Sequence, residues 1–261
     1  MKVTCIQMGI RFADPDENFS HAIHLMEEAM AEKPDVLVLP ENWNTGFFKN
    51  TSELSLTDRD GQRVKAEIGG FAKKHSVNIV AGSVSDVREG KCHNTAYVFD
   101  RQGNCIASYD KIHLFSPTGE GRFYTPGSQV CRFQLDGINC GVIICYDLRF
   151  PELTRMMTVP GIDVLFMVSQ WPTVRTTHLR TLTAARAIEN QIFFICCNAC
   201  GKAGETLCAG NSAIIDPWGK TLALAGEEEQ LLSAQLDFSI LQNIRTSINV
   251  FADRRPEVYG M

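Results

Sequence analysis

Short, continuously apolar runs alternate along the chain with segments in which apolar residues recur at helical spacing. Residues 36–39, 77–83 and 164–169 are runs of the first kind, which is typical of strands buried on both faces of a sheet. Residues 176–190 are of the second kind, with an apolar stripe that includes Leu179. The pattern therefore predicts an α/β protein in which buried strands alternate with amphipathic helices.

The first predicted helix has clear signals at both ends. Asp14 stands at the N-cap, Pro15 suits the first turn, and Glu17 is the capping-box partner. The helical pattern continues towards Glu32, where a Lys-Pro pair ends it. The sequence therefore predicts a helix over most of residues 15–32.

The middle of the chain predicts two β-hairpins, one pairing residues 95–99 with 105–109 and one pairing 130–135 with 138–145. Further strands are predicted at residues 2–8, 192–198, 213–216, 221–224 and 231–236, and further helices at 61–74 and from Pro151 onward. The chain contains no repeat and no linker, so we expect one domain over residues 1–261. Hairpins combined with crossover helices predict layers of sheet with helices outside them.

Charge and hydropathy exclude two classes of partner. Thirty acidic residues against 25 basic ones give a net charge of −5 without any basic run, which argues against a nucleic-acid partner. The longest apolar stretches, such as residues 192–197, are far too short to span a membrane. The first nine residues read as a strand rather than a secretion signal. We therefore expect a cytoplasmic protein.

The ten cysteines fit buried free thiols better than disulfides. Many of them, such as Cys5, Cys140 and Cys196, lie inside apolar strand-like runs, and free buried thiols suit a reducing compartment. Cys197 and Cys200 form a C-x-x-C pair. A non-catalytic protein that binds a thiol or a metal through this pair is one alternative function, although the pair lies at a strand end and lacks a second pair at zinc-ribbon spacing.

Three chemically reactive residues directly follow predicted strands: Glu41, Lys111 and Cys145. Ligand sites in α/β sheets gather at the carboxyl ends of strands, so these side chains can meet in one place. A thiolate can attack a carbonyl or nitrile carbon, and a carboxylate can take its proton and return it to a leaving amine. An ammonium group, together with the backbone N–H of Tyr146, can stabilise an oxyanion. A rival Cys–His site would need His113 or His178 as its base.

The segments around these residues resemble the nitrilase, or carbon–nitrogen hydrolase, superfamily, and in particular its ω-amidase-like branch. The matching segments are LPENWNTGF at 39–47, YDKIHLF at 109–115, GVIICYDLRFPE at 141–152, QWP at 170–172 and ARAIENQ at 185–191. They occur in the same order as in the family and extend over essentially the whole chain.

The resemblance implies a four-layer α-β-β-α sandwich and a homodimer, without a cofactor or metal. It assigns Glu41 as base, Lys111 as oxyanion stabiliser and Cys145 as nucleophile, and it makes Glu120, in the segment GEGRFYTPG, a second active-site glutamate. The implied reaction is ammonia release from a small ω-amide of a dicarboxylate through a thioester. An N-carbamoyl amide hydrolase and a nitrilase use the same triad and remain alternatives.

Other residues of the matching segments are candidates for substrate contact. Three aromatic residues of these loops could form the wall of the pocket: Trp43, Phe47 and Trp171. Arg149 could bind a substrate carboxylate with its two-pronged guanidinium group, or it could pair with Asp147 or Glu152 and hold the loop. We favour the second interpretation of Arg149, because the segment is shared by family members with different substrates.

Overall fold

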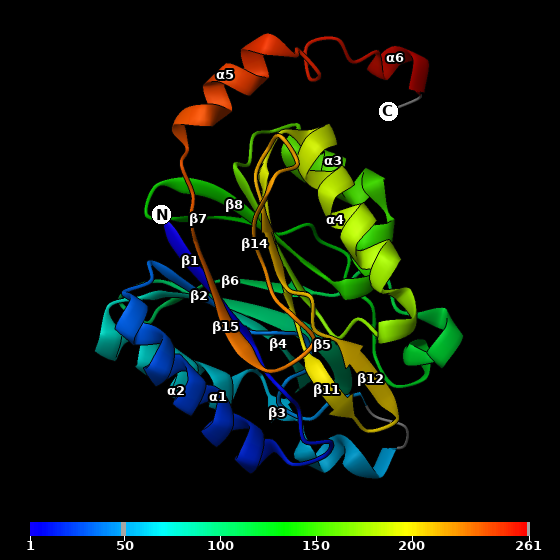
Figure 1. Ribbon diagram of the computed structural model, residues 1–261. Coiled ribbons are helices and arrows are strands. Elements are labelled where there is room, and N and C mark those ends of the chain that lie inside the picture. Colours follow the sequence, from blue (N-terminus) through cyan, green and yellow to red (C-terminus); the bar gives the residue numbers. More distant parts are fainter. Residues whose placement is uncertain (48–50, 260–261) are drawn as a thin grey trace.

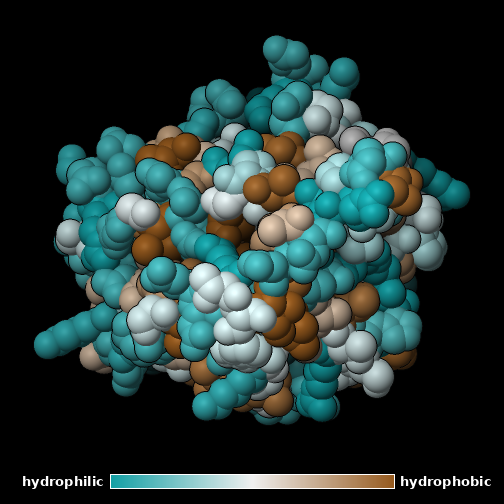
Figure 2. All heavy atoms as spheres, turned by 90° about the horizontal axis from the view of Figure 1, so that it is seen from above, coloured by the Kyte–Doolittle hydropathy of each residue, from teal (hydrophilic) through white to brown (hydrophobic). Residues whose placement is uncertain are grey.

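Two β-sheets lie face to face, and each is covered by helices on its outer side (Figure 1). The structure, a computed structural model, describes residues 1–47 and 51–259. The arrangement confirms the expected four-layer α-β-β-α sandwich. Within the described residues, no helix is both long enough and apolar enough to cross a membrane. The face seen from above has hydrophobic residues scattered among hydrophilic ones (Figure 2).

The first sheet is built mainly from the N-terminal half of the chain. Its strands are β1 (Lys2–Gln7), β2 (Val36–Val38), β3 (Asp58–Arg59), β4 (Asn78–Arg88), β5 (Lys91–Phe99), β6 (Cys105–Asp110) and β15 (Gln230–Gln235). They lie in the order β15-β1-β2-β4-β5-β6, with β3 beside β4. The inner strands β1, β2 and β4 are parallel, so their carboxyl ends meet at one edge.

The second sheet is built from the C-terminal half. Its strands are β7 (Arg132–Leu135), β8 (Ile138–Ile144), β9 (Val164–Ser169), β10 (Phe193–Asn198), β13 (Ala213–Ile215) and β14 (Thr221–Leu224). They lie in the order β14-β13-β10-β9-β8-β7, and the inner strands β8, β9 and β10 are parallel. A separate hairpin joins β11 (Cys200–Ala203) to β12 (Thr206–Ala209).

Four of the α-helices form the two outer layers (Figure 1). The α-helices are α1 (Pro15–Ala29), α2 (Gln62–His75), α3 (Pro151–Thr158), α4 (Thr176–Asn190), α5 (Ser239–Ser247) and α6 (Pro256–Tyr259). The 3-10 helices are η1 (Met30–Glu32), η2 (Thr51–Leu56), η3 (Ser116–Thr118), η4 (Glu120–Arg122), η5 (Cys145–Arg149) and η6 (Thr173–Arg175). Figure 1 shows α1 and α2 on the first sheet, and α3 and α4 on the second, whereas α5 and α6 lie in the C-terminal segment beyond them. The predicted cap is present, because the Asp14 side chain accepts a hydrogen bond from the Glu17 N–H at 3.2 Å.

Alternate residues of each inner strand belong to different cores, which explains the continuously apolar runs. Val36 and Val38 pack between the two sheets, whereas Leu37 packs against α1 and α2. In the second sheet Phe166 packs between the sheets, whereas Leu165 packs towards α3 and α4. Strands with apolar side chains on both faces are stable only when both faces are covered. The three cores therefore hold the four layers together.

Several predicted boundaries were wrong. The strand expected at residues 77–83 continues to Arg88 and forms one long hairpin with β5, because Glu89 and Gly90 both adopt positive φ angles and supply the turn. The β11–β12 hairpin and α5 were not predicted. The strand expected at residues 138–145 ends one residue early, since Cys145 begins η5.

Candidate active site

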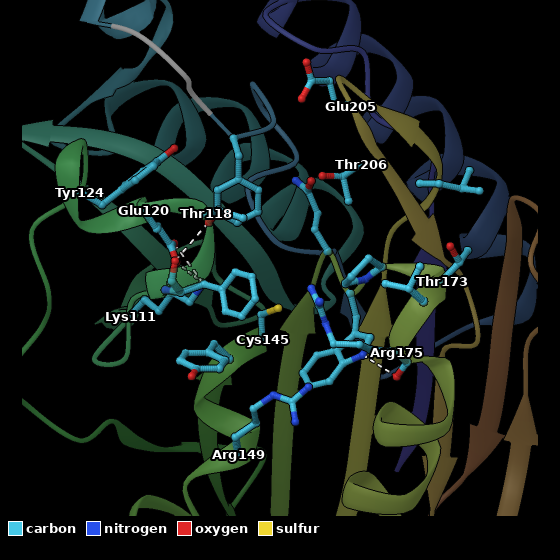
Figure 3. A pocket seen from close by; sticks show the side chains of 18 residues that line it. Lys111, Thr118, Glu120, Tyr124, Cys145, Arg149, Thr173, Arg175, Glu205 and Thr206 are labelled. Carbon is cyan, nitrogen blue, oxygen red and sulfur yellow. Dashed lines mark hydrogen bonds and ion pairs between the residues drawn. The ribbon is translucent and has the colours of Figure 1, made fainter.

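A cavity of about 570 Å³ opens where strand ends of both sheets meet (Figure 3). Lys111 and Glu120 reach it from the first half of the chain, and Cys145 and Gln170 reach it from the second sheet. Apolar side chains make up most of its wall. A concave apolar site with a few converging polar groups is what a small-molecule site requires.

Glu41 lies in the loop after β2, and a close backbone approach shapes that loop. Gly82 has a φ of +61°, and a Cβ at this position would lie 2.0 Å from the Pro40 carbonyl oxygen, so no other residue fits without moving the loop. The Glu41 side chain is fully buried. Its Oε2 accepts a hydrogen bond from the Gln170 N–H at 2.9 Å, which ties the carboxylate to the second sheet.

Lys111 directly follows β6 and binds two carboxylates. Its Nζ lies 2.9 Å from Glu41 Oε1 and 3.0 Å from both oxygens of Glu120. Burial acts to lower the pKa of Lys111, but the two carboxylates outweigh it and raise the pKa above its usual range. The ammonium therefore stays charged at neutral pH.

Glu120 is held in place from two sides. Its Oε2 accepts a hydrogen bond from the Phe115 N–H at 2.5 Å, and Asn94 Nδ2 lies 3.5 Å from its Oε1. Burial raises the pKa of Glu120, the Lys111 ammonium opposes that shift, and the nearby Glu41 carboxylate adds to it. Two carboxylates around one ammonium form a compact charged cluster at the inner end of the cavity.

Cys145 occupies a sharp turn after β8. Its φ of +45° is in the left-handed region, which an L-residue adopts only when the surroundings hold it there. The Asp147 carboxylate supplies that hold, because it accepts hydrogen bonds from the N–H groups of Ile144 and His113 at 3.0 Å and from Tyr109 Oη at 2.7 Å. The half-buried Cys145 thiol faces the cavity.

The Cys145 thiol is protonated at rest. Burial raises its pKa well above the usual range, the Glu41 carboxylate adds to the rise, and the Lys111 ammonium opposes it. The thiol lies within hydrogen-bonding reach of Glu41. A nearby base is therefore needed before this sulfur can act as a thiolate.

The rival sites that the sequence left open lie elsewhere. Cys197 is fully buried, and its Sγ hydrogen-bonds to the carbonyl oxygens of Ile6 and Val38. His113 Nδ1 lies 2.7 Å from Asp147 Oδ1, and the His113 ring stacks on Phe150. These contacts give both residues a structural role in the packing.

The comparisons with known proteins agree with this geometry. The family model described as carbon-nitrogen hydrolase matches residues 2–246. The chain belongs to the carbon–nitrogen hydrolase family.

The relatives of this carbon–nitrogen hydrolase include named amidases. The 2-oxoglutaramate amidase of Bacillus subtilis (strain 168) is 42% identical over 258 residues, which cover 98% of both chains. The structure of Nit3 from Saccharomyces cerevisiae has a TM-score of 0.89 at 27% identity and covers 98% of this chain and 96% of its own. A mutant of the amidase from Nesterenkonia sp. AN1, in which a glutamate is replaced by leucine, has a TM-score of 0.84 at 25% identity, over 99% of this chain and 95% of its own. That structure shows the acetamide moiety of fluoroacetamide added covalently at the active site cysteine.

Only some of the residues predicted to contact substrate line the cavity of this hydrolase. Phe47 and Trp171 line it, as do Tyr146 and Arg149. Trp43 does not: it is fully buried against Phe19, and its indole N–H donates to the Ala81 carbonyl oxygen.

The ion pairs expected of Arg149 are not present among the described residues, and its role stays a prediction. Both oxygens of Asp147 are occupied by other partners, and within the described residues no ion pair joins Arg149 to Asp147 or Glu152. Its guanidinium lies over the Trp171 ring, with Cζ 4.8 Å from the ring centroid, and contacts His178. The side chain is therefore available to a ligand in the cavity.

Sequence reasoning missed two polar residues of the site. Asn94, in the middle of β5, donates from Nδ2 to Glu41 Oε1 at 2.9 Å and is fully buried. The sequence gives no clear signal for it, because its neighbours His93 and Thr95 in β5 are polar too. Arg175 also lines the cavity, but before the fold is known it reads as a solvated charge at the start of a helix.

Proposed function

We propose that this carbon–nitrogen hydrolase is an amidase that releases ammonia from a small ω-amide of a dicarboxylate, with 2-oxoglutaramate as an example, through a thioester on Cys145. The observation that carries the proposal is the buried cluster of Glu41, Lys111 and Glu120 beside a half-buried thiol in one cavity. The names of the relatives support the substrate class.

The first half-reaction forms the thioester. Glu41 takes the proton of the Cys145 thiol, and the sulfur attacks the amide carbonyl carbon. The Lys111 ammonium and the Tyr146 N–H stabilise the oxyanion. Glu41 then gives its proton to the nitrogen, the C–N bond breaks, and ammonia leaves.

The second half-reaction restores the enzyme. Glu41 takes a proton from a water molecule, whose oxygen attacks the thioester carbonyl. Collapse of the intermediate breaks the C–S bond, releases the acid and returns the proton to the sulfur. Glu120 acts by positioning Lys111, because it binds the ammonium through both oxygens at 3.0 Å.

The cavity wall suggests how the far end of the substrate is bound. Phe47 and Trp171 flank the site with aromatic surface, which suits the short carbon chain of an ω-amide. Arg149 lies over Trp171, and its guanidinium matches a carboxylate in shape and charge.

An ammonia-release screen tests the proposed function. We expect ω-amides that carry a carboxylate to be the preferred substrates over nitriles and N-carbamoyl compounds. Preference for a nitrile or an N-carbamoyl amide would reassign the substrate while leaving the triad in place. Absence of turnover with every class, in a folded protein, would contradict the proposal and favour a non-catalytic thiol protein.

Brief labelling with iodoacetamide is expected to modify Cys145 before the nine other cysteines. Glu41 lies within hydrogen-bonding reach of this thiol and can deprotonate it, whereas the other cysteines are buried except Cys105. Peptide mapping measures the order of labelling. Glu41→Gln should slow labelling of Cys145 and leave Cys105 as an internal control. Faster modification of Cys197 or Cys200 would favour the thiol-site alternative.

We further propose a homodimer that forms through α3 and α4. Met156 on α3 and Ile188 on α4 are 62% and 51% exposed, and Trp218 is 49% exposed in a turn next to Ile188. Since α3 directly follows η5, an interface here would support the turn that carries Cys145.

Light scattering is expected to give twice the 29.0 kDa mass of one chain. Met156→Glu should shift the mass towards the monomer and lower activity, because it places a charge in the apolar interface. Ile106→Glu, at a 39% exposed position on β6, is the matched control and should leave the dimer intact. A fully active monomer at micromolar concentration would refute this assembly.

The same proposal includes a single domain over residues 1–261 and a cytoplasmic location. Each of the ten cysteines is free, and free thiols persist in a reducing compartment. One core is formed by strands from both halves of the chain. Each sheet therefore needs the other half to cover its inner face, which supports one domain.

A further inference from the structure

Arg175 is fixed at the mouth of the cavity by two aromatic residues. Its guanidinium Cζ lies 5.0 Å from the centroid of the Phe115 ring. Its carbonyl oxygen accepts a hydrogen bond from the Trp171 indole N–H at 2.8 Å. A guanidinium stacked on a ring keeps its N–H donors free in its own plane. Stacking therefore orients Arg175 without using its hydrogen-bonding capacity.

Arg175 also differs from other arginines of the chain in its partners. Arg63, Arg88 and Arg101 each pair with one or more carboxylates. Within the part of the chain that the structure describes, no ion pair joins Arg175 or Arg149 to a carboxylate. Both are half-buried and line the same cavity. Glu205 lines the cavity as well, but no ion pair between described residues joins it to either arginine. Two guanidinium groups that face one cavity without pairing to a carboxylate can bind an anionic ligand.

The two arginines are linked through Trp171. The Arg149 guanidinium lies over the Trp171 ring, and the Trp171 indole N–H binds the backbone of Arg175. Figure 3 shows Lys111 and Glu120 on one side of Cys145 and Arg175 on the other. The cavity thus has Lys111 and Glu120 at one end, and the two guanidinium groups and the Glu205 carboxylate elsewhere in its wall.

We propose that Arg175 is a specificity-determining residue, which forms with Arg149 an anion subsite for the carboxylate at the far end of the substrate. The inference rests on the proposed amidase function and extends it to a residue outside the matching motifs. Each carboxylate oxygen has two lone-pair directions, so two guanidinium groups can bind one carboxylate from different sides. Arg175 thereby makes the enzyme select short amides with a negative charge opposite the amide.

The test compares two amides of the same shape. Glutaramate carries a carboxylate where 5-methylhexanamide carries an isopropyl group. Arg175→Met should lower kcat/KM for glutaramate by about 10- to 100-fold, mainly through KM, because a hydrogen bond to a charged group is lost. Hydrolysis of 5-methylhexanamide, which carries no carboxylate, should fall much less, so the ratio of the two kcat/KM values measures the effect. The inhibition constant of glutarate should rise in parallel with the KM for glutaramate.

Two further variants separate binding from structural effects. Arg175→Lys keeps the charge and should retain part of the preference for glutaramate. Arg132→Met removes an exposed arginine on β7 and should leave kcat/KM for both amides unchanged. Equal losses on both amides, or an unchanged glutarate inhibition constant, would overturn the subsite. If the folded wild type hydrolysed neither amide, the amidase function itself would fail; if it hydrolysed both and Arg175→Met kept the same preference, only the subsite would fail.

Discussion

Glu41→Gln is expected to lower kcat by about 10²–10⁴-fold, the range that general acid–base catalysis contributes. In the proposed mechanism Glu41 moves protons in both half-reactions. Glutamine has the same shape as glutamate. Its oxygen can still accept the hydrogen bonds that Lys111 and Asn94 donate to Glu41 Oε1 at 2.9 Å in the wild type. It cannot take the thiol proton, and the resting thiol is protonated because its pKa is raised.

Glu120→Gln is the matched control, since it neutralises the other carboxylate of the same cluster. Glu120→Gln should lower kcat on the order of 100-fold, which is the effect of misplacing a reacting group. Rates of ammonia release from one amide are compared, with circular dichroism to establish folding. Near-normal turnover by folded Glu41→Gln would exclude Glu41 as the base and return a histidine mechanism through His113 or His178 to contention.

Lys111→Met is expected to lose both activity and stability. Removing an oxyanion donor costs about 3–4 kcal/mol of transition-state stabilisation. Removing the cation that pairs with two buried carboxylates costs about 3–5 kcal/mol of folding free energy. Both Glu41 and Glu120 lie within 3.0 Å of Nζ, so the variant leaves them facing each other without a counter-charge.

The stability loss of Lys111→Met should depend on pH. Burial and the Glu41 carboxylate raise the pKa of Glu120, and removing the Lys111 ammonium takes away the charge that opposes this rise. A raised folded-state pKa gives stability at low pH that is lost as pH rises. The difference in Tm between wild type and variant should therefore grow from pH 5 to pH 8.

Thermal melts at both pH values measure this effect. Adding Glu120→Gln to Lys111→Met should recover part of the lost stability, because it removes one of the two charges. Lys91→Met, at an exposed position of β5, controls for the loss of one lysine. A difference in Tm that stayed constant with pH would show that lost packing, rather than unpaired carboxylates, destabilises the variant.

The layered fold was largely predictable from the sequence because its inner strands are buried on both faces. Residues 36–39 and 164–168 contain no polar position, which indicates strands buried on both faces. The β11–β12 hairpin escaped prediction because its strands have four residues each and include exposed positions such as Lys202 and Leu207. Short strands of this kind give no alternating pattern to detect.

The reactive residues were predictable for a different reason. Glu41, Lys111 and Cys145 each stand directly after a strand, and the motifs around them identify the family. Asn94 and Arg175 carry no such signal, because their importance comes from neighbours that are distant in sequence. Asn94 meets Glu41 across 53 positions of the chain, a contact that only the pairing of strands creates.

The site has components from both sheets, with Glu41 and Lys111 on the first and Cys145 on the second. The reacting atoms are therefore carried by two different sheets, and their spacing depends on how the sheets pack against the core between them. A substitution in that core, for example at Val38 or Val168, can disturb the chemistry from a distance without changing any residue of the cavity. In this enzyme the packing between the sheets is itself part of the catalytic alignment.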